Sequence, residues 1–455
     1  MRAKPLTKVL AEFVVNSKFE AIPLLAIERA KMSLMSTLAS AVAGYKIPSS
    51  SMIRTLEVAS GGSAEALVWY HGARLPVANA ARVNAIASDA SASDDSDLRS
   101  IAHIGTAISA AGMAVGECLS RPGKDILTAM VLGYEIAGRI DESLTPGRMQ
   151  RGFHGTVSTI FGSAVAAGKL YELDVDRMAH AIALAATSAC GMAIAADTSC
   201  SREYGAGNAT MLGIHAARAA QAGFQGELHV LEATRGFLSA MKGEDIQAIH
   251  QDLGGEWDIV TDMAVKLMPG AHPFHTLAEA AIEATTSGNI APADIKRIVV
   301  RGGFQWTAFR GEPHPRNLIE AAHSLYYFIA LSVVERQFGW DALDRSKMLD
   351  PVVATVQNKI EFDPIPPILP DRFPHHHGGQ VTIILNDGKQ FSAIRMKPKG
   401  SHSGGIQWND VDKKFRELMS LNGRNIDDVE RCVAVLHAFE LQDDVTKLLE
   451  CLINI

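Results

Sequence analysis

The feature that most constrains the fold is a series of segments, between about residues 20 and 250, in which apolar residues recur with a helical period. In the segment 22–44, Leu34 and Leu38 belong to such a row, and the segment ends at a glycine. The same pattern returns in the stretches 125–144, 156–173, 176–195 and 207–223. Helices rich in alanine and glycine can pack closely, so this region is predicted to be a compact all-helical bundle.

The pattern changes after about residue 265. β-branched runs at 297–302 and 381–385 have the length of strands, and the second is followed by the turn Asn386-Asp387-Gly388 and a further strand at 391–396. Helical patterns are found at 315–337, 408–421 and 427–436, and the proline-dense stretch 363–374 is predicted to be an extended surface connection. The prediction is a mainly α protein, with a helical domain formed by residues 1–264 and 399–455 and a smaller α+β lid domain at 265–398.

Composition excludes several classes of function. The net charge of −7 argues against a nucleic-acid partner, because phosphate backbones require a concentrated positive surface. No apolar stretch reaches the roughly 20 residues that span a bilayer, and the first residues lack the apolar core of a secretory signal. The five cysteines have no CxxC spacing, which favours reduced thiols and a cytoplasmic location. Nucleotide-binding glycine loops, HExxH and GxSxG are all missing.

The candidate chemistry lies in polar clusters within apolar helical sequence. Asp94, Asp95 and Ser96 are followed by His103, and adjacent carboxylates near a histidine can share acid–base work. The alternative is a solvated loop with a helix cap. His154 comes just before a predicted helix, where it can face an anion or serve only in packing. Arg202 precedes a glycine-rich helix start and offers a fixed cation for a carboxylate.

A further cluster lies at the proposed domain junction. Lys266 is followed by His272 and His275, whose spacing could bind a metal, but no third or fourth ligand is indicated. Tyr327 falls inside a predicted helix, where a tyrosine is usually part of the core. The run His375-His376-His377 is predicted to be a surface loop, because consecutive side chains of an extended chain point to opposite faces.

Seven segments in a fixed order carry a resemblance to a known family. They are NAIASDASASDDS with His103 downstream, LGYEIAGR, FHGTVSTIFGSAVAAGKL, AGNA, KLMPGAHPFH, HSLYYFIA, and LNDGKQFSAIRMKPKGS followed by KKFREL. In this order they resemble the MmgE/PrpD family, which includes 2-methylcitrate dehydratase, cis-aconitate decarboxylase and iminodisuccinate epimerase. The resemblance covers nearly the whole chain.

The resemblance implies a fold and an activity. The implied fold is a helical domain built from both chain ends plus an α/β lid, assembled as a homodimer. The implied site lies in the cleft between the domains and works on small di- or tricarboxylates without metal or organic cofactor. The residues implied to be catalytic are Asp94, His103, His154, Lys266 and Tyr327. The residues implied to bind substrate are Asp95, Ser96, Arg202 and His275.

This chain departs from the family pattern at three places. Ala92 stands where an acidic residue is frequent, Arg202 to Gly205 replace a Lys-Arg-x-His motif, and Gly270-Ala271 replace a cysteine pair. We expect a cofactor-independent lyase, either a dehydratase or a decarboxylase, because the shared chemistry handles a carbon next to a carboxylate. An epimerase is the second hypothesis. A non-catalytic member of the family and a metal-dependent hydrolase are the remaining alternatives.

Overall fold

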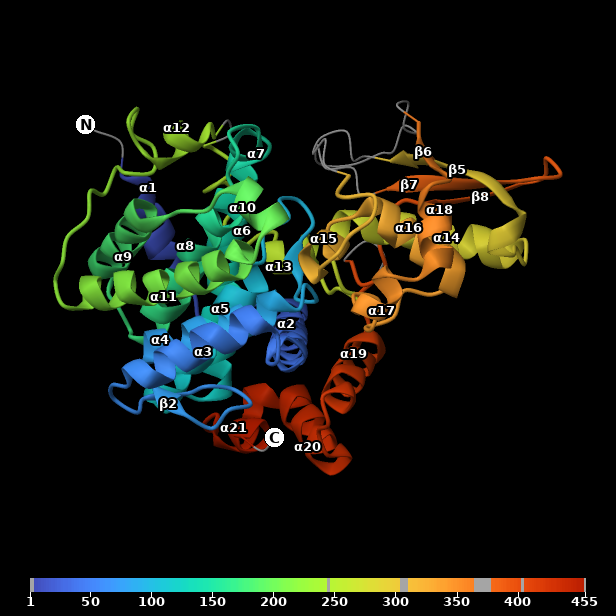
Figure 1. The fold of residues 1–455 in the computed structure, drawn as a ribbon. Helices are drawn as coiled ribbons and strands as arrows, with labels where there is room; N and C mark the ends of the chain where they lie inside the picture. Colours follow the sequence, from blue (N-terminus) through green and yellow to red (C-terminus); the bar gives the residue numbers. More distant parts are fainter. Residues whose placement is uncertain (1–3, 244–245, 303–309, 364–377, 402–404, 454–455) are drawn as a thin grey trace. The chain divides into compact units, whose positions relative to one another are not determined.

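The chain divides into two compact units in a computed structural model that describes residues 4–243, 246–302, 310–363, 378–401 and 405–453 (Figure 1). The first unit comprises Met1–Ala196, Cys200–Val265 and Gln407–Ile455, and the second comprises Asp197–Ser199 and Lys266–Ile406. Helices dominate and the sheets are small, which confirms the predicted fold class. The predicted domain boundaries, after residues 264 and 398, stay a prediction.

The first unit is mainly helical. Its helices before the second unit are α1 (Leu6–Asn16), η1 (Phe19–Ala21), α2 (Leu24–Gly44), α3 (Pro48–Ser60), α4 (Val77–Ala90), α5 (Ile104–Cys118), α6 (Gly123–Leu144), α7 (Gly147–Gln150), α8 (Thr156–Leu170), α9 (Val175–Ser188), α10 (Ala193–Thr198), α11 (Ser201–Gln221), α12 (Phe237–Met241) and α13 (Asp258–Thr261). After the second unit come α19 (Trp408–Leu421), α20 (Ile426–His437), η6 (Phe439–Leu441) and α21 (Thr446–Ile453).

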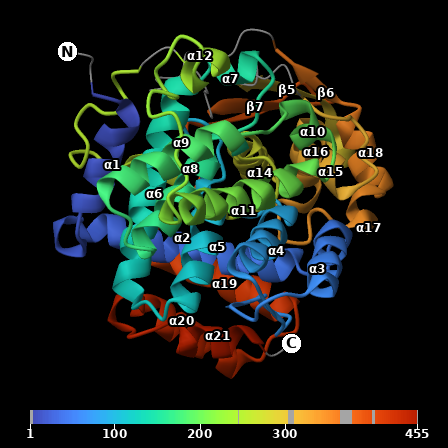
Figure 2. The ribbon, with the colours of Figure 1, turned by 90° about the vertical axis from the view of Figure 1, so that its left-hand side faces the viewer.

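Small residues bring the central helices together. Helices α5, α6, α8 and α11 pack against one another, and nearly every residue of α6 is buried (Figure 2). A Cβ atom added to Gly133 of α6 would lie 2.6 Å from the Gly162 carbonyl oxygen of α8. The two backbones are therefore in direct contact, as the alanine- and glycine-rich pattern predicts.

Two short ladders and the C-terminal helices complete the first unit. Strand β1 (Ala66–Leu67) pairs with β2 (Arg74–Leu75), and β3 (Ser96–Asp97) pairs with β4 (Met263–Ala264), both antiparallel. Helix α19 packs on α2, so the two ends of the chain belong to one unit.

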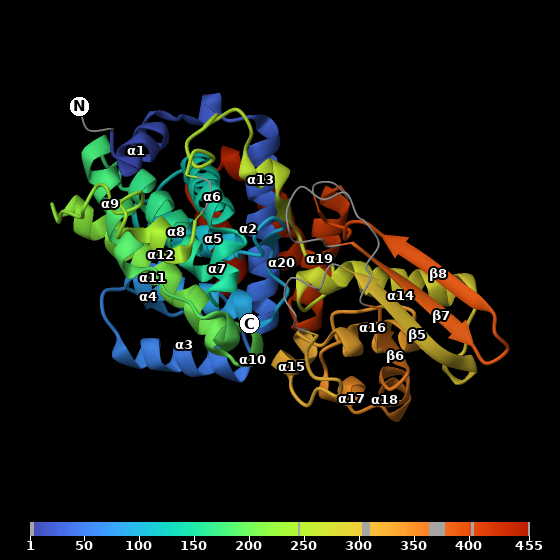
Figure 3. The same ribbon diagram turned by 90° about the horizontal axis from the view of Figure 1, so that it is seen from above.

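The second unit is a four-stranded sheet covered by helices (Figure 3). The strand order is β6-β5-β7-β8, with β5 parallel to β6 and the other pairs antiparallel. The elements are η2 (His272–Phe274), α14 (His275–Ser287), η3 (Pro292–Asp294), β5 (Ile295–Gly302), α15 (Leu318–Ala322), α16 (Leu325–Glu335), α17 (Arg345–Met348), α18 (Pro351–Gln357), β6 (Ile360–Phe362), β7 (Gly379–Leu385) and β8 (Gln390–Arg395). Helix α14 packs against β7 and β8.

Two helices predicted from the sequence are interrupted. The predicted helix 176–195 ends at Ser188, and the chain then makes a bridge between Met192 and Phe153 before α10 begins. The predicted helix 315–337 is split into α15 and α16, because the Ser324 side chain accepts a hydrogen bond from the Tyr327 N–H and caps the second helix.

Among the described residues, no helix combines the length and the apolar character that a bilayer crossing demands.

The contact between α6 and α8 predicts a large effect of one added methyl group. Gly133→Ala is expected to lower the free energy of unfolding by about 1–3 kcal/mol, because its Cβ would overlap a backbone oxygen that cannot move alone. Gly112→Ala on α5 is the matched control, since its Cβ would meet the flexible Met130 side chain at 3.2 Å. Urea unfolding of both variants measures the difference, and equal stability of the two would contradict the close-contact argument.

Candidate active site

A histidine and two carboxylates meet where α4 ends and α5 begins. His103 Nδ1 lies 2.7 Å from Asp89 Oδ1 and 2.8 Å from Asp94 Oδ2. Carboxylates only accept hydrogen bonds, so we assign the ring hydrogen to Nδ1. Nε2 of the neutral ring is then the nitrogen that can accept a proton from another group.

The local backbone explains why these groups converge. After α4 the chain turns at Ala92, which has a positive φ of 52°, and the Ala92 N–H donates to the Asp89 carbonyl. Thr106, in the first turn of α5, donates its hydroxyl to Asp94 Oδ2 at 2.8 Å. The turn thus returns the Asp94 carboxylate to the start of α5, where His103 precedes the helix.

Asp95 points to a different set of partners. Ser33 of α2 donates to Asp95 Oδ2 at 2.6 Å, and an added Cβ at Gly105 would overlap both of these groups. Burial raises the pKa of Asp95 to about 6, against the opposing effects of the Ser33 hydrogen bond and the Lys414 charge. Of the two neighbouring carboxylates, the structure therefore brings Asp94 to His103 and places Asp95 with Ser33.

Lys414 of α19 holds the same loop from the C-terminal part of the chain. Its ammonium group donates to the Ser36 hydroxyl at 2.8 Å and to the Ser93 carbonyl. Ser96, predicted to bind substrate, is buried and paired with Ala264 in the β3–β4 ladder. The substrate contacts of Asp95 and Ser96 stay a prediction.

Arg202 completes the buried cluster from the first turn of α11. Its Nε donates to Asp89 Oδ2 at 3.0 Å and its Nη2 to the Asp89 carbonyl at 2.6 Å. The guanidinium group therefore neutralises Asp89. Sequence reasoning missed Asp89, although a carboxylate at the negative end of a helix signals a nearby cation.

His154 lies beside His103 just before α8. The two ring centroids are 6.0 Å apart, and His154 is partly exposed. Burial lowers the pKa of His154 to about 3, and the neighbouring His103, when it is protonated, and Arg148 add to this effect. The ring is consequently neutral at physiological pH and is a weak base.

His154 and Arg202 both line a cavity of about 230 Å³ within the first unit. Its other walls come from α8, from the segment between α9 and α10, and from α11. A neutral histidine and an arginine at one cavity can bind a carboxylate next to a reacting carbon.

The remaining predicted residues belong to the second unit. Lys266 is 2% exposed, and the His272 and His275 rings have centroids 4.6 Å apart, with His275 stacked on Phe328. Tyr327 is buried and donates its hydroxyl to the Ala342 carbonyl at 2.5 Å, and burial raises the pKa of its phenol well above the usual value. The catalytic roles of Lys266 and Tyr327 and the substrate contact of His275 stay predictions. The run His375–His377 lies outside the described residues.

Asp89, Asp94 and His103 are also the residues best placed to hold a metal ion. Their ligand atoms all lie within 4.8 Å of one another. Arg202, at 3.0 Å from Asp89, already supplies positive charge at this place, so the donor set is satisfied as a hydrogen-bonded cluster.

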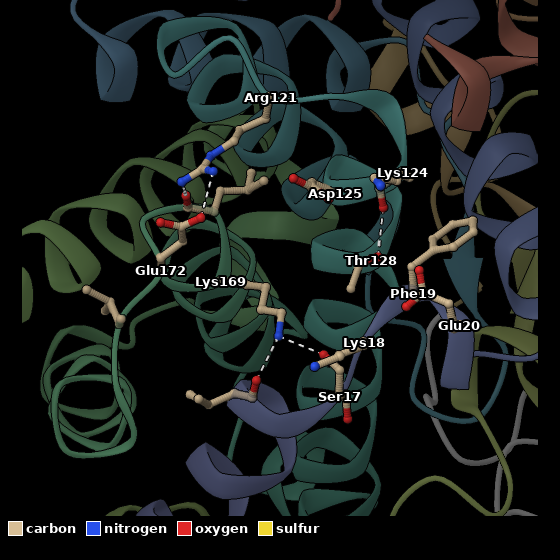
Figure 4. A pocket seen from close by; sticks show the side chains of 13 residues that line it. Ser17, Lys18, Phe19, Glu20, Arg121, Lys124, Asp125, Thr128, Lys169 and Glu172 are labelled. Atoms are coloured by element: carbon tan, nitrogen blue, oxygen red, sulfur yellow. Dashed lines mark hydrogen bonds and ion pairs between the residues drawn. The ribbon is translucent and has the colours of Figure 1, made fainter. Parts of the chain in front are cut away.

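A second cavity, of about 390 Å³, lies where α1, α6 and α8 meet (Figure 4). Its most buried cation, Lys169, donates to the carbonyls of Val14, Val15 and Ser17 at 2.7–3.0 Å. Lys169 therefore caps the C-terminal end of α1, and the charge is used by the fold. Arg121 in the same wall pairs with Glu172.

The lowered pKa of His154 predicts a pH-dependent stability. The unfolded chain binds a proton at this histidine below about pH 6.5, whereas the folded chain does so only near pH 3. Stability is therefore lost as the pH falls, and between pH 7 and pH 5 wild type is expected to lose up to about 2 kcal/mol more than His154→Gln. Urea unfolding at both pH values measures this. Cys190→Ser, in the same cavity wall, is the control and should follow wild type; equal losses in all three proteins would refute the assignment.

Comparison with known proteins places this chain in a family. Residues 8–249 match the model of the MmgE/PrpD N-terminal domain, and residues 268–434 match that of the C-terminal domain. The chain is 25% identical to cis-aconitate decarboxylase of Homo sapiens, over 98% of this chain and 94% of the relative.

Fungal relatives give the same result. Identity is 25% to cis-aconitate decarboxylase of Aspergillus terreus, over 87% of this chain and 85% of the relative. The identity is 24% to a cis-aconitate decarboxylase-like protein of Aspergillus oryzae, over 97% of this chain and 96% of the relative. Since the two domain models together span most of the sequence, the chain belongs to the MmgE/PrpD family.

Proposed function

We propose that this protein is a cofactor-independent lyase that removes carbon dioxide from a small unsaturated di- or tricarboxylate. The observation that carries the proposal is the pair of histidines with ring centroids 6.0 Å apart, one bonded to two carboxylates and the other neutral beside an arginine-lined cavity. The names of the relatives favour decarboxylation over the loss of water.

The proposed roles of the residues follow from where negative charge develops on the substrate. In a decarboxylation the bond to one carboxylate breaks, carbon dioxide leaves, and the electron pair stays on the neighbouring carbons, which then take up a proton. The carboxylates of Asp89 and Asp94 stabilise the positive charge that His103 gains when Nε2 holds that proton. Arg202 offers its remaining nitrogen, Nη1, to a second carboxylate of the substrate.

His154 has the complementary role. As a neutral ring it can take a proton from the substrate or from water, although its lowered pKa makes it a weak base. Two neighbouring histidines are also what an epimerase needs, because it removes a proton on one face and returns one on the other. An epimerase of a small dicarboxylate is therefore our second candidate.

One assay separates these reactions. The purified protein is incubated with cis-aconitate in deuterated water, and carbon dioxide release and proton spectra are followed together. Carbon dioxide with deuterium in the product supports a decarboxylase, water addition or loss supports a dehydratase, and exchange of a carbon-bound hydrogen alone supports an epimerase. No reaction with a panel of di- and tricarboxylates would contradict the proposal and favour a non-catalytic protein.

Replacing His154 tests the assignment of the base. His154→Ala is expected to lower turnover by roughly 10²- to 10⁴-fold, the range for a lost proton carrier. His215→Ala, an exposed histidine on α11, is the matched control and should keep wild-type turnover. Far-ultraviolet circular dichroism checks that both variants fold, and full activity of His154→Ala would return the residue to a packing role.

The predicted roles of Lys266 and Tyr327 need their own variants. We propose that Lys266 binds a substrate carboxylate and that Tyr327 delivers a proton. Lys266→Met should then raise KM more than it lowers kcat, whereas Tyr327→Phe should lower kcat. If Tyr327→Phe keeps the wild-type kcat, the role of the Tyr327 hydroxyl is structural, through its hydrogen bond to the Ala342 carbonyl.

We further propose a cytoplasmic homodimer. All five cysteines are unpaired, as expected for a reducing compartment. Large apolar side chains are exposed on α3 and near α10, namely Met52 at 66%, Leu56 at 56%, Met192 at 55% and Ile194 at 69%, and such surfaces favour association. Light scattering at micromolar concentration should give about twice 48.7 kDa, and a monomer would contradict the dimer.

A further inference from the structure

The cavity beside His154 has a mixed lining. It contains the partly exposed His154 ring and the buried Arg202, whose guanidinium is held by Asp89. Its apolar side chains come from α8, α10, α11 and the segment before α10, and they are Ile160, Met192, Ala195, Ala196, Ala209 and Leu212. Its polar side chains include Ser188, Ser201, Tyr204 and Asn208.

The cavity is larger than one ring requires, because a dry cavity of about 150 Å³ accepts benzene and this one measures about 230 Å³. Arg202 is the charged residue of its lining, and Ile160, Met192 and Leu212 supply large apolar side chains against which an alkyl group can pack. The Thr156 hydroxyl, also in the wall, already donates to the Cys190 carbonyl.

Gly205 is the reason that the space is open. It lies in α11 facing the cavity, and a Cβ built on it would meet the nearest atoms, those of the Thr156 side chain, only at 3.6 and 3.8 Å. These are ordinary contacts, and Gly205 has no positive φ, so the backbone does not require a glycine here. Any larger side chain at this position would occupy the cavity.

We propose, resting on the proposed function, that the substrate of this protein carries an apolar branch of about four to six carbon atoms, which enters this cavity. One carboxylate pairs with Arg202 Nη1, and the carbon next to it faces His154. A substrate without the branch leaves apolar wall exposed to water and binds more weakly. The cavity is then a specificity subsite that selects alkyl-substituted polycarboxylates.

The first test measures binding of unreactive probes to the wild-type protein. The probes are succinate and its 2-methyl, 2-butyl and 2-hexyl derivatives, with calorimetry giving Kd for each. Each buried methylene should tighten binding about fourfold until the cavity is full. Butanol, which has no carboxylate, is the control for unspecific apolar binding and should not compete with butylsuccinate.

The possible results separate this inference from the proposed function. Tighter binding along the series supports the subsite. Equal Kd values for succinate and its alkyl derivatives would overturn the subsite while leaving a carboxylate-binding enzyme. If no succinate binds at all and the unsaturated polycarboxylates show no reaction either, the proposed function fails together with the inference.

Variants at Gly205 locate the effect in the cavity. Gly205→Leu fills the space and should reduce the advantage of butylsuccinate over succinate to threefold or less. Gly205→Ala, which adds one methyl group in open space, should keep most of that advantage. Both changes favour the helix, so both proteins are expected to fold. If a folded Gly205→Leu protein still prefers butylsuccinate over succinate as strongly as wild type does, the proposal is overturned. If that variant is unstable, the Kd values of the wild-type series decide the question.

Discussion

The carboxylate of Asp89 lies between a histidine and an arginine, and the rest of the site depends on how its charge is shared. One oxygen faces His103 Nδ1 at 2.7 Å and the other accepts from Arg202 Nε at 3.0 Å. All three side chains are buried, so removing Arg202 would leave the Asp89 charge in a medium that cannot solvate it, at a cost of several kcal/mol. The cluster thereby orients His103 and at the same time limits how far Arg202 can move toward a ligand.

This arrangement gives the two neighbouring histidines different environments. His103 has two carboxylates at one nitrogen, whereas His154 lies closer to positive charges and loses much of its hydration. Different environments of two neighbouring titratable groups are a common basis for dividing acid and base roles in an active site. The difference depends on charges held by α4, by the loop before α5 and by α11, and Arg202 of α11 also lines the cavity.

Much of this could be predicted from the sequence, and the reasons for the exceptions are physical. Helices such as α2, α8 and α19 carry their period in local sequence, so their positions could be predicted. His103 and His154 can be predicted as candidates because they flank helices within recognisable motifs, and their catalytic roles stay predictions. Asp89 was missed because its partner Arg202 comes 113 residues later, and no local pattern connects them. Asp94 and Asp95 look equivalent in sequence, but adjacent side chains diverge, and tertiary contacts with Ser33 and Thr106 decide which one meets the histidine.

The hydrogen bonds of Lys414 link the site to the order in which the chain is made. Its ammonium group reaches Ser36 near the beginning of the chain and the Ser93 carbonyl in the loop that carries Asp94. During synthesis the first 265 residues emerge before α19 exists, and the loop then lacks its buried cation. The loop that carries Asp94 therefore gains its buried cation only after the entire second unit has been translated and α19 has left the ribosome.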